Sequence, residues 1–185
     1  MNKTVTTEQD ILRVSRRMVL EEGILAFSMR SVAKACGVAV GSLYNYFPSK
    51  SGLLGATIES IWREIFLPFE QHEEFDGFVD CISCMFDTIL AGNQKYPGFL
   101  NIHSLHFVSS EKEEGRQQMD RYFSRLQERL LTVLKNDSAV RKGAFSEELS
   151  METFTDYSFT LLITILVSRQ EDCTELLQMI RNCIY

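Results

Sequence analysis

The sequence predicts an all-α protein. Apolar residues recur at helical spacing along most of the 185 residues, and no segment alternates polar and apolar residues with a period of two. Only three prolines and ten glycines are available to interrupt long helices. We expect about nine helices, arranged as an N-terminal three-helix domain, residues 1–48, and a larger helical domain, residues 49–185.

The first two predicted helices are bounded by capping residues. The first helix is predicted to begin near Thr6 or Thr7, and Thr6, with Gln9 three residues later, has the form of a capping box. Gly23 is suited to end this helix. The second helix is short, with Ser28 suited to its N-cap and Gly37 to its C-terminal stop.

A third short helix is predicted from Val40 to about Phe47, because Pro48 disfavours helical geometry in the preceding residue. Ser49 is suited to cap a long fourth helix, which Pro68 is expected to kink or end.

The larger domain is predicted to contain five more helices. They span about residues 76–95, about residues 99–107, residues 119–135, a segment that begins at Ser146, and a segment that begins at Asp172. The helix that begins at Ser146 is apolar on nearly all sides from Tyr157 to Val167. Such a helix must be buried on all sides, which a small monomeric domain cannot provide, so we expect one face to meet a second protomer.

The charge is unevenly distributed along the chain. Residues 1–55 carry seven bases and four acids, a net charge of +3, whereas residues 56–185 carry twelve bases and twenty-one acids, a net charge of −9. The overall net charge of −6 argues against nonspecific binding of nucleic acid by the whole molecule. A basic head on an acidic body indicates that the head meets a polyanion.

Residues 28–47 have the pattern of a helix-turn-helix: two short helices joined by Gly37-Val38-Ala39. The second helix of such a motif must enter a DNA major groove about 12 Å wide. In this chain that helix begins with small residues. The wider segment from Ile11 to Leu54 resembles the N-terminal domain of the TetR/AcrR family of transcriptional regulators. The matching residues are Glu22-Gly23, Ser28-Met29-Arg30-Ser31-Val32-Ala33, Cys36-Gly37-Val38, Gly41-Ser42-Leu43-Tyr44-Asn45-Tyr46-Phe47, Ser49-Lys50 and Leu53-Leu54.

This resemblance implies a set of DNA-contacting residues. Ser28 and Lys50 would bind phosphates at helix N-termini, where backbone N–H groups favour anions. Tyr44 would give its hydroxyl to a phosphate, and Tyr46 could face a phosphate or a base, although core packing is the alternative for both tyrosines. The full set is Ser28, Arg30, Val40, Gly41, Ser42, Tyr44, Asn45, Tyr46 and Lys50.

Two positions depart from the family pattern. Many members have Ser or Thr where this chain has Ala39, which cannot cap the third helix. Many have a basic residue where this chain has Val40, so a phosphate or guanine contact is lost and a thymine methyl contact becomes available.

The resemblance also implies a dimer that binds a palindromic operator and is released by a small molecule. Aromatic residues past position 60 suggest an apolar or aromatic effector. The pocket candidates, for which plain core packing is the alternative, are Trp62, Phe66, Met85, Phe86, His103, Phe107, Tyr122 and Phe123. The dimer-interface candidates are Leu161, Leu162, Ile165, Leu177 and Ile180.

Other classes of protein are less well supported. Cys81 and Cys84, with His103 and His106, invite a zinc site, but their spacing is poor for structural zinc, and we expect no metal or cofactor. No nucleophile elbow or phosphate loop indicates an enzyme. A thiol-sensing or ligand-binding dimer with weak DNA binding remains the alternative to a regulator.

The expected location is the cytoplasm. The first ten residues hold no apolar signal-peptide core, and the longest apolar stretch has eleven residues against the twenty or so of a membrane span. Five cysteines at irregular spacings are expected to be free thiols, most of them buried.

Overall fold

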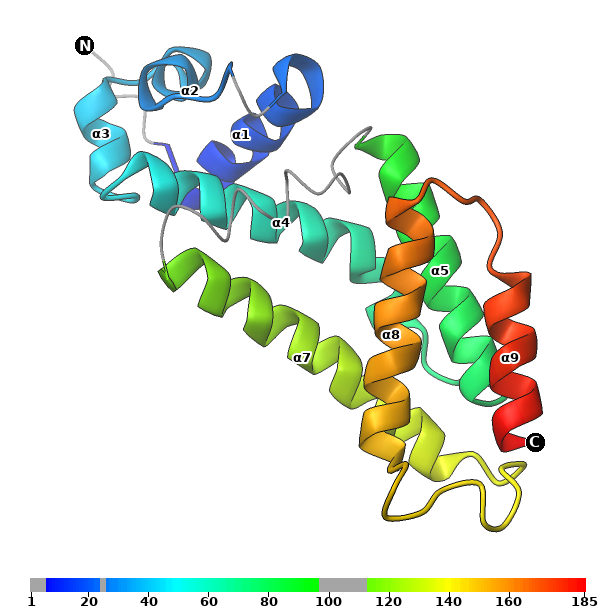
Figure 1. Cartoon of the computed structure of the whole chain (residues 1–185). Helices are drawn as coiled ribbons and strands as arrows, with labels where there is room; N and C mark the ends of the chain where they lie inside the picture. Colours follow the sequence, from blue (N-terminus) through cyan, green and yellow to red (C-terminus); the bar gives the residue numbers. More distant parts are fainter. Residues whose placement is uncertain (1–5, 24–25, 97–112) are drawn as a thin grey trace. The chain divides into compact units, whose positions relative to one another are not determined.

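The computed structural model describes residues 6–23, 26–96 and 113–185. In the last of these ranges, side chains are described from Tyr122 onward. These residues form eight helices and no strand, so the all-α prediction is confirmed (Figure 1). The predicted helix near residues 99–107 lies outside the described residues. The helices are α1 Glu8–Glu22, α2 Met29–Cys36, α3 Val40–Tyr44, α4 Lys50–Gln71, α5 Phe78–Lys95, α7 Glu113–Asn136, α8 Met151–Val167 and α9 Thr174–Ile184.

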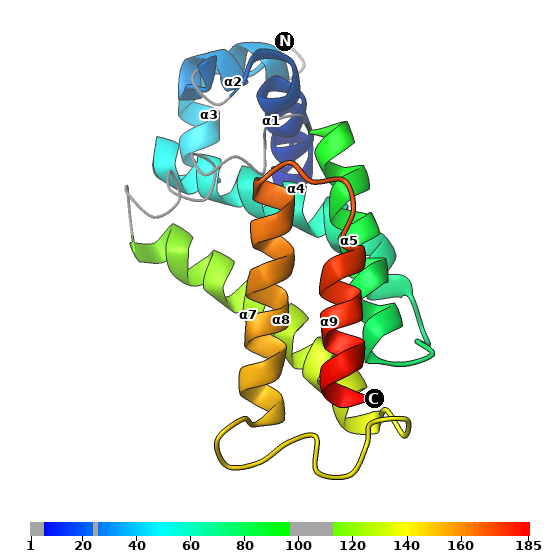
Figure 2. The same ribbon diagram turned by 45° about the vertical axis from the view of Figure 1, so that its right-hand side comes forward.

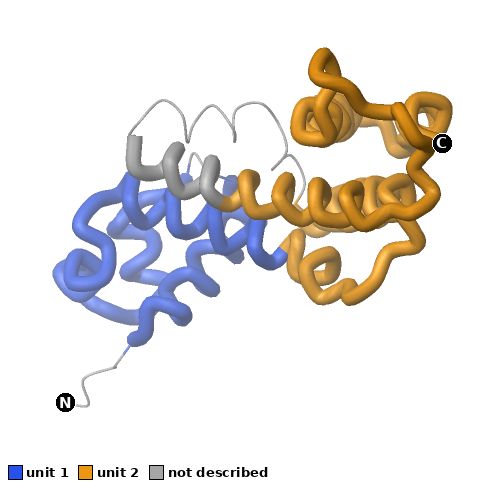
Figure 3. Tube along the Cα trace, turned by 90° about the horizontal axis from the view of Figure 1, so that it is seen from below, with its two compact units in different colours: residues 1–64, 105–119 blue, residues 65–104, 120–185 orange. Residues whose placement is uncertain are grey.

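The chain divides into two compact units (Figure 3). The first comprises Met1–Glu64 with Leu105–Met119, and the second comprises Ile65–Ser104 with Asp120–Tyr185. The division falls inside α4, so this helix contributes residues to both units.

The first unit is built around α1, α2, α3 and the start of α4. Each of these helices contributes at least one fully buried apolar side chain, among them Ile11, Val32, Leu43 and Leu53. α2 packs against both α1 and α3. The core therefore holds the two short helices in place, which their own backbone hydrogen bonds could not do.

The ends of the short helices follow from local chemistry. Gly23 and Gly37 have φ angles of 77° and 68°, in the left-handed region that favours glycine, so both predicted stops are confirmed. The predicted start of α1 near Thr6 or Thr7 is confirmed, but the predicted capping box at Thr6 is wrong. Thr7, not Thr6, is the N-cap, and its hydroxyl accepts a hydrogen bond from the N–H of Asp10 and donates to the Asp10 carboxylate.

Pro68 does not end α4, because the helix continues to Gln71. The carbonyls beyond it are held by Arg129 of α7, whose guanidinium donates to the carbonyl of Glu70 at 2.7 Å and to the carbonyl of His72. A cation beside the last carbonyls of a helix is favoured by the helix dipole. Within the second unit, α7 therefore binds the end of α4.

The guanidinium of Arg129 also lies over two aromatic rings. Its central carbon is 5.0 Å from the ring centre of Phe69 and 5.5 Å from that of Phe75. These two rings are tilted against each other with centres 5.5 Å apart. One charged side chain thus joins α7 to the last turn of α4 and to the segment that follows it.

The start of α5 is capped by a residue distant in sequence. The N–H of Phe78 donates to the carboxylate of Asp137 at 2.8 Å, and the hydroxyl of Tyr185 donates to the same oxygen. Gly77 lies so close that a Cβ there would be 2.8 Å from this oxygen and 3.1 Å from the Tyr185 hydroxyl. Asp137 therefore connects the start of α5, the end of α7 and the end of α9.

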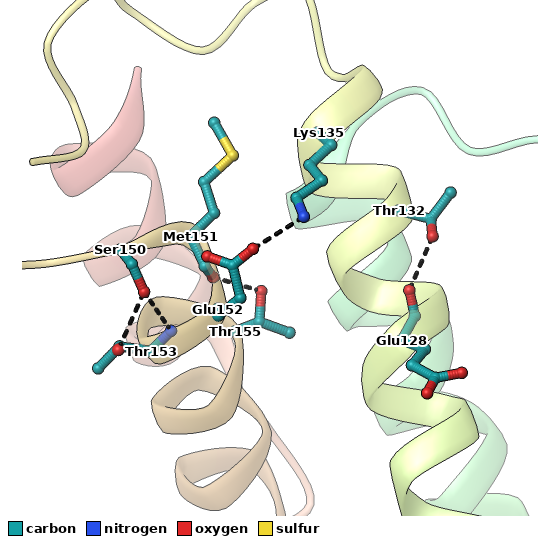
Figure 4. A network of polar contacts seen from close by, with 8 residues as sticks. All are labelled: Glu128, Thr132, Lys135, Ser150, Met151, Glu152, Thr153 and Thr155. Atoms are coloured by element: carbon teal, nitrogen blue, oxygen red, sulfur yellow. Dashed lines mark hydrogen bonds and ion pairs between the residues drawn. The ribbon is translucent and has the colours of Figure 1, made fainter. Parts of the chain in front are cut away.

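α8 and α9 lie side by side in two views, and both pack against α5 (Figures 1 and 2). The start of α8 differs from the prediction: Ser150 is the N-cap, and the hydroxyl of Ser146 instead accepts from backbone N–H groups in a preceding turn. Lys135 of α7 pairs with Glu152 of α8 at 2.8 Å, which joins the two helix ends around the intervening loop (Figure 4).

We predict that Gly77→Ala lowers the free energy of unfolding by about 1–2 kcal/mol, because the methyl group displaces the Asp137 carboxylate from the α5 N-terminus. The control is Gly41→Ala. A Cβ on Gly41 meets nothing within 4 Å, so this change should stabilise the protein by about 0.5–1 kcal/mol. Urea unfolding at one fixed protein concentration measures both values. Equal effects of the two changes would contradict the role given to Gly77.

Candidate nucleic-acid interface

The helix-turn-helix consists of α2, a turn at residues 37–39 and α3. The turn is closed by hydrogen bonds from the N–H of Gly37 to the carbonyl of Lys34 and from the N–H of Val38 to the carbonyl of Ala33. Leu43 of α3 is fully buried, and Phe47 after it is 6% exposed. These two side chains fix which face of α3 points to the core and which points to solvent.

The solvent face of α3 carries most of the predicted base-contacting residues. Gly41, Tyr44 and Asn45 are exposed, and Val40 and Ser42 are half-buried. Ala39 is the N-cap and makes no side-chain capping bond, as predicted from its methyl side chain. The first turn of α3 is therefore small and open, which suits close approach to the floor of a groove.

The two predicted tyrosines are at the surface, which excludes core packing for either one. Tyr44 is 49% exposed and Tyr46 is 40% exposed. Their hydroxyls differ. That of Tyr46 donates to the carbonyl of Thr6 at 2.6 Å, whereas no hydrogen bond is found for that of Tyr44 among the described residues.

The N-terminus of α2 has a reciprocal capping box. Ser28 accepts from the N–H of Ser31, and the N–H of Ser28 donates to the Ser31 hydroxyl. The two hydroxyls are 2.9 Å apart, so the Ser28 side chain is engaged by the cap. The N–H groups of Met29 and Arg30 have no acceptor within the helix, and they are the donors this terminus offers to an anion.

The N-terminus of α4 offers a second set of donors. The Ser49 hydroxyl accepts from the N–H of Gly52 at 3.0 Å, which confirms the predicted cap. The N–H groups of Lys50 and Ser51 have no acceptor within the helix. Lys50 is exposed, so its ammonium adds a mobile positive charge at the same terminus.

The chemistry of this surface suits a nucleic-acid backbone. Arg30 at the start of α2 and Lys50 at the start of α4 are both exposed, and each sits beside unpaired backbone N–H groups. Helix N-termini and cations of this kind bind phosphates and thereby set the position of the helix that reads bases. The short α3, with its small open first turn, lies between them in the chain.

The predicted pocket residues are mostly core. Trp62 of the first unit is 1% exposed, and in the second unit Phe66 and Met85 are each 0% exposed. Phe86 and Tyr122 are also buried, while Phe123 is half-buried. His103 and Phe107 lie outside the described residues.

Two clefts in the second unit have other linings. One, of about 760 Å³, is bounded by the segment before α5 and the end of α7. The other, of about 370 Å³, lies between the start of α5 and α9. Neither contains any of the predicted pocket residues, so no ligand site is assigned to either cleft.

The predicted interface residues divide between core and surface. Leu162 and Ile180 are fully buried within the protomer, Ile165 and Leu177 are half-buried, and Leu161 is 40% exposed. Two exposed apolar residues that the sequence interpretation missed are Tyr157, 62% exposed on α8, and Met179, 42% exposed on α9. Tyr157 lies four residues before Leu161, one helical turn along the same face, and this spacing could have identified it.

The buried Cys81 and Cys173 and the half-buried Cys84 are poor candidates for redox switches. Burial raises the pKa of the Cys81 thiol to about 12 and that of Cys173 to about 11, and it also raises the pKa of Cys84. Reaction requires the thiolate, which a raised pKa disfavours near neutral pH. Within the described ranges, no group of three or more His, Cys, Asp or Glu side chains could hold a metal, and no helix could cross a bilayer.

Comparison with known proteins agrees with this geometry. Residues 11–57 match the family model for bacterial regulatory proteins of the tetR family. The nucleoid occlusion factor SlmA of Glaesserella parasuis is 28% identical over 131 residues, which are 71% of this chain and 65% of that protein. The chain therefore matches slightly less than two thirds of this relative's length.

Solved structures share the fold. The TetR transcriptional regulator from Legionella pneumophila is 20% identical with a TM-score of 0.63, and each chain is covered in full. BioQ, solved with its double-stranded DNA operator, is 17% identical with a TM-score of 0.60, over 90% of this chain and 87% of BioQ.

We predict that the thiols of the native protein react in order of exposure. Cys183 is exposed and should be alkylated first at pH 7, while Cys81 and Cys173, buried and with raised pKa, should react only after unfolding. Mass spectrometry after timed alkylation measures the order, and Cys183→Ser should remove the fast phase. Rapid labelling of Cys81 in folded protein would overturn this order and revive a thiol sensor.

Proposed function

The chain belongs to the TetR family of bacterial regulatory proteins, and we propose that it is a dimeric repressor that is released from palindromic operator DNA by a small apolar or aromatic effector. Regulators of this family bind double-stranded DNA as dimers, and they are not enzymes. The observation that carries the proposal is the pair of open helix N-termini, at α2 and α4, on either side of α3 in the chain.

In this proposal residues 1–48 form the DNA-binding head and residues 49–185 the effector-binding and dimerisation part. Arg30 and Lys50, with the N–H groups beside them, hold phosphates. Val40, Gly41, Ser42 and Asn45 then face base edges. Ser28 acts through the α2 cap rather than through a hydroxyl contact, because its side chain is engaged by Ser31.

Dimerisation is proposed through the exposed face of α8 and the edge of α9. Tyr157, Leu161 and Met179 are the apolar side chains left uncovered there. Leu162 and Ile180 support the same helices from inside the protomer. Two-fold symmetry would place two recognition helices about 34–36 Å apart, one turn of DNA, which is the basis for expecting a palindrome.

Effector release requires an affinity difference. An effector shifts the equilibrium only if it binds the conformation that cannot hold the operator more tightly than the one that can. The effector site is proposed within the second unit, near Phe66 of α4, Met85 and Phe86 of α5, and Tyr122 and Phe123 of α7.

A second function is favoured by the relatives. The SlmA similarity extends over 131 residues, far beyond the 47 matched by the family model, and those relatives are named nucleoid occlusion factors. Genome-wide occupancy separates the two functions. A repressor should occupy a few promoters, whereas an occlusion factor should occupy many sites, most of them outside promoters.

We predict tight binding to DNA beside the chain's own gene, at tens of nanomolar or better, and weak binding to an unrelated duplex. Fluorescence anisotropy at two salt concentrations measures both affinities. Lys50→Ala should weaken binding to both duplexes. It should also reduce by about one the slope of log binding constant against log salt concentration, since one phosphate contact is lost. Gly41→Ala should weaken operator binding while stabilising the fold, because its methyl group enters space that DNA would fill.

The control for lost charge is Lys142→Ala, which removes an exposed lysine from the loop between α7 and α8. It should leave both affinities unchanged. If the wild-type protein bound every duplex equally and lost this binding at higher salt, sequence-specific binding to this DNA would be contradicted. The alternative of a ligand-binding or thiol-sensing dimer with weak DNA binding would then be favoured.

We predict that Leu161→Glu breaks the dimer, because a carboxylate would be buried in an apolar contact. Analytical ultracentrifugation should show a monomer, with operator affinity reduced at least tenfold as the second half-site is lost. Leu20→Glu is the matched control: Leu20 is 43% exposed on α1 in the first unit, and its replacement should leave the dimer intact. A dimeric Leu161→Glu protein would move the interface elsewhere.

A further inference from the structure

The hydroxyl of Tyr46 donates a hydrogen bond to the carbonyl of Thr6, at 2.6 Å and across forty residues of sequence. This distance lies at the short end of the usual range for O–H···O bonds. The bond joins the turn after α3 to the residue just before the N-cap of α1, and both ends belong to the first unit.

The acceptor end of this bond is well anchored. The hydroxyl of Thr7, the next residue, bonds both the N–H and the carboxylate of Asp10, and that carboxylate pairs with Arg13 at 2.7 Å. One turn further, Ile11 is fully buried in the core. The Thr6 carbonyl is therefore fixed to a capped helix rather than to a frayed end.

The donor end is fixed to α3. The N–H groups of Tyr46 and Phe47 both donate to the carbonyl of Leu43, at 3.0 and 2.8 Å. Leu43 is fully buried and Phe47 nearly so. The Tyr46 backbone thus moves with the C-terminal end of α3, and its hydroxyl braces that end against the start of α1.

Such a brace matters because α3 is weak by itself. It has five residues, and Ala39 gives it no side-chain cap. A helix this short has no independent stability, so its orientation is set by contacts with its surroundings. The core holds one face through Leu43 and Phe47, and the Tyr46 bond adds a polar restraint at the C-terminal end of α3.

We propose that Tyr46 is a positioning residue for base recognition, and that its hydroxyl does not bind DNA. It holds α3 at the angle from which Val40, Gly41, Ser42 and Asn45 meet base edges, while Tyr44, which has an unengaged hydroxyl, contacts a phosphate. The proposal rests on the proposed DNA-binding function. Base contacts carry sequence information and phosphate contacts do not, so loss of the brace reduces discrimination between DNA sequences.

The test compares two single-atom deletions, Tyr46→Phe and Tyr44→Phe, on operator and unrelated duplexes by fluorescence anisotropy. Tyr44→Phe removes a phosphate contact and lowers both affinities by a similar factor, about threefold to tenfold. Tyr46→Phe lowers operator affinity by about the same factor and leaves unrelated-duplex affinity unchanged. The ratio of the two affinities therefore falls only in the Tyr46 variant.

Thermal unfolding of both variants serves as the folding control. The bond is exposed, so the midpoint of Tyr46→Phe should stay within a few degrees of wild type. An equal loss on both duplexes in Tyr46→Phe would overturn the proposal and assign its hydroxyl to a phosphate. An unchanged operator affinity would also overturn it. Failure of the wild-type protein to prefer any duplex would instead refute the proposed regulator itself.

Discussion

A helix of five residues such as α3 cannot hold its own conformation, and the architecture of the first unit follows from that constraint. The buried side chain of Leu43 secures one face of α3. The left-handed turn at Gly37 sets the entry from α2, and Ser49 begins α4 three residues after the turn at Tyr46. The first turn on the outward face is open, since a Cβ on Gly41 would meet no described atom within 4 Å.

The second unit meets a related requirement, since helix ends that lie inside it need partners. Arg129 supplies donors to the last carbonyls of α4, and Asp137 supplies an acceptor to the first N–H of α5. Arg129 is in α7, and Asp137 is the residue directly after it. α7 therefore sets the geometry of the connection between α4 and α5, and with Lys135 it also reaches the start of α8.

Features set by neighbouring residues could be predicted from the sequence. Gly23, Gly37 and Ser49 act over one turn, so their roles follow from the sequence alone. Contacts between distant residues could not be predicted. Neither the Asp137 cap on α5 nor the Tyr46 bond to Thr6 has a local signal, because the partners are 59 and 40 residues apart. The same limit applies to α8: its composition indicates burial on all sides, but only packing against α5 and α9 shows that Leu162 is inside and Tyr157 outside.

In the proposed mechanism, α4 is the element through which an effector acts on DNA binding. It begins at Lys50, beside the proposed phosphate contacts, and ends at Gln71, next to carbonyls held by Arg129. Its residues are divided between the two units, so one helix contains both Lys50 of the first unit and the end that Arg129 holds in the second. Coupling of this kind needs no long chain of contacts. It needs only that effector binding favour a different position of α4 from the one the operator requires.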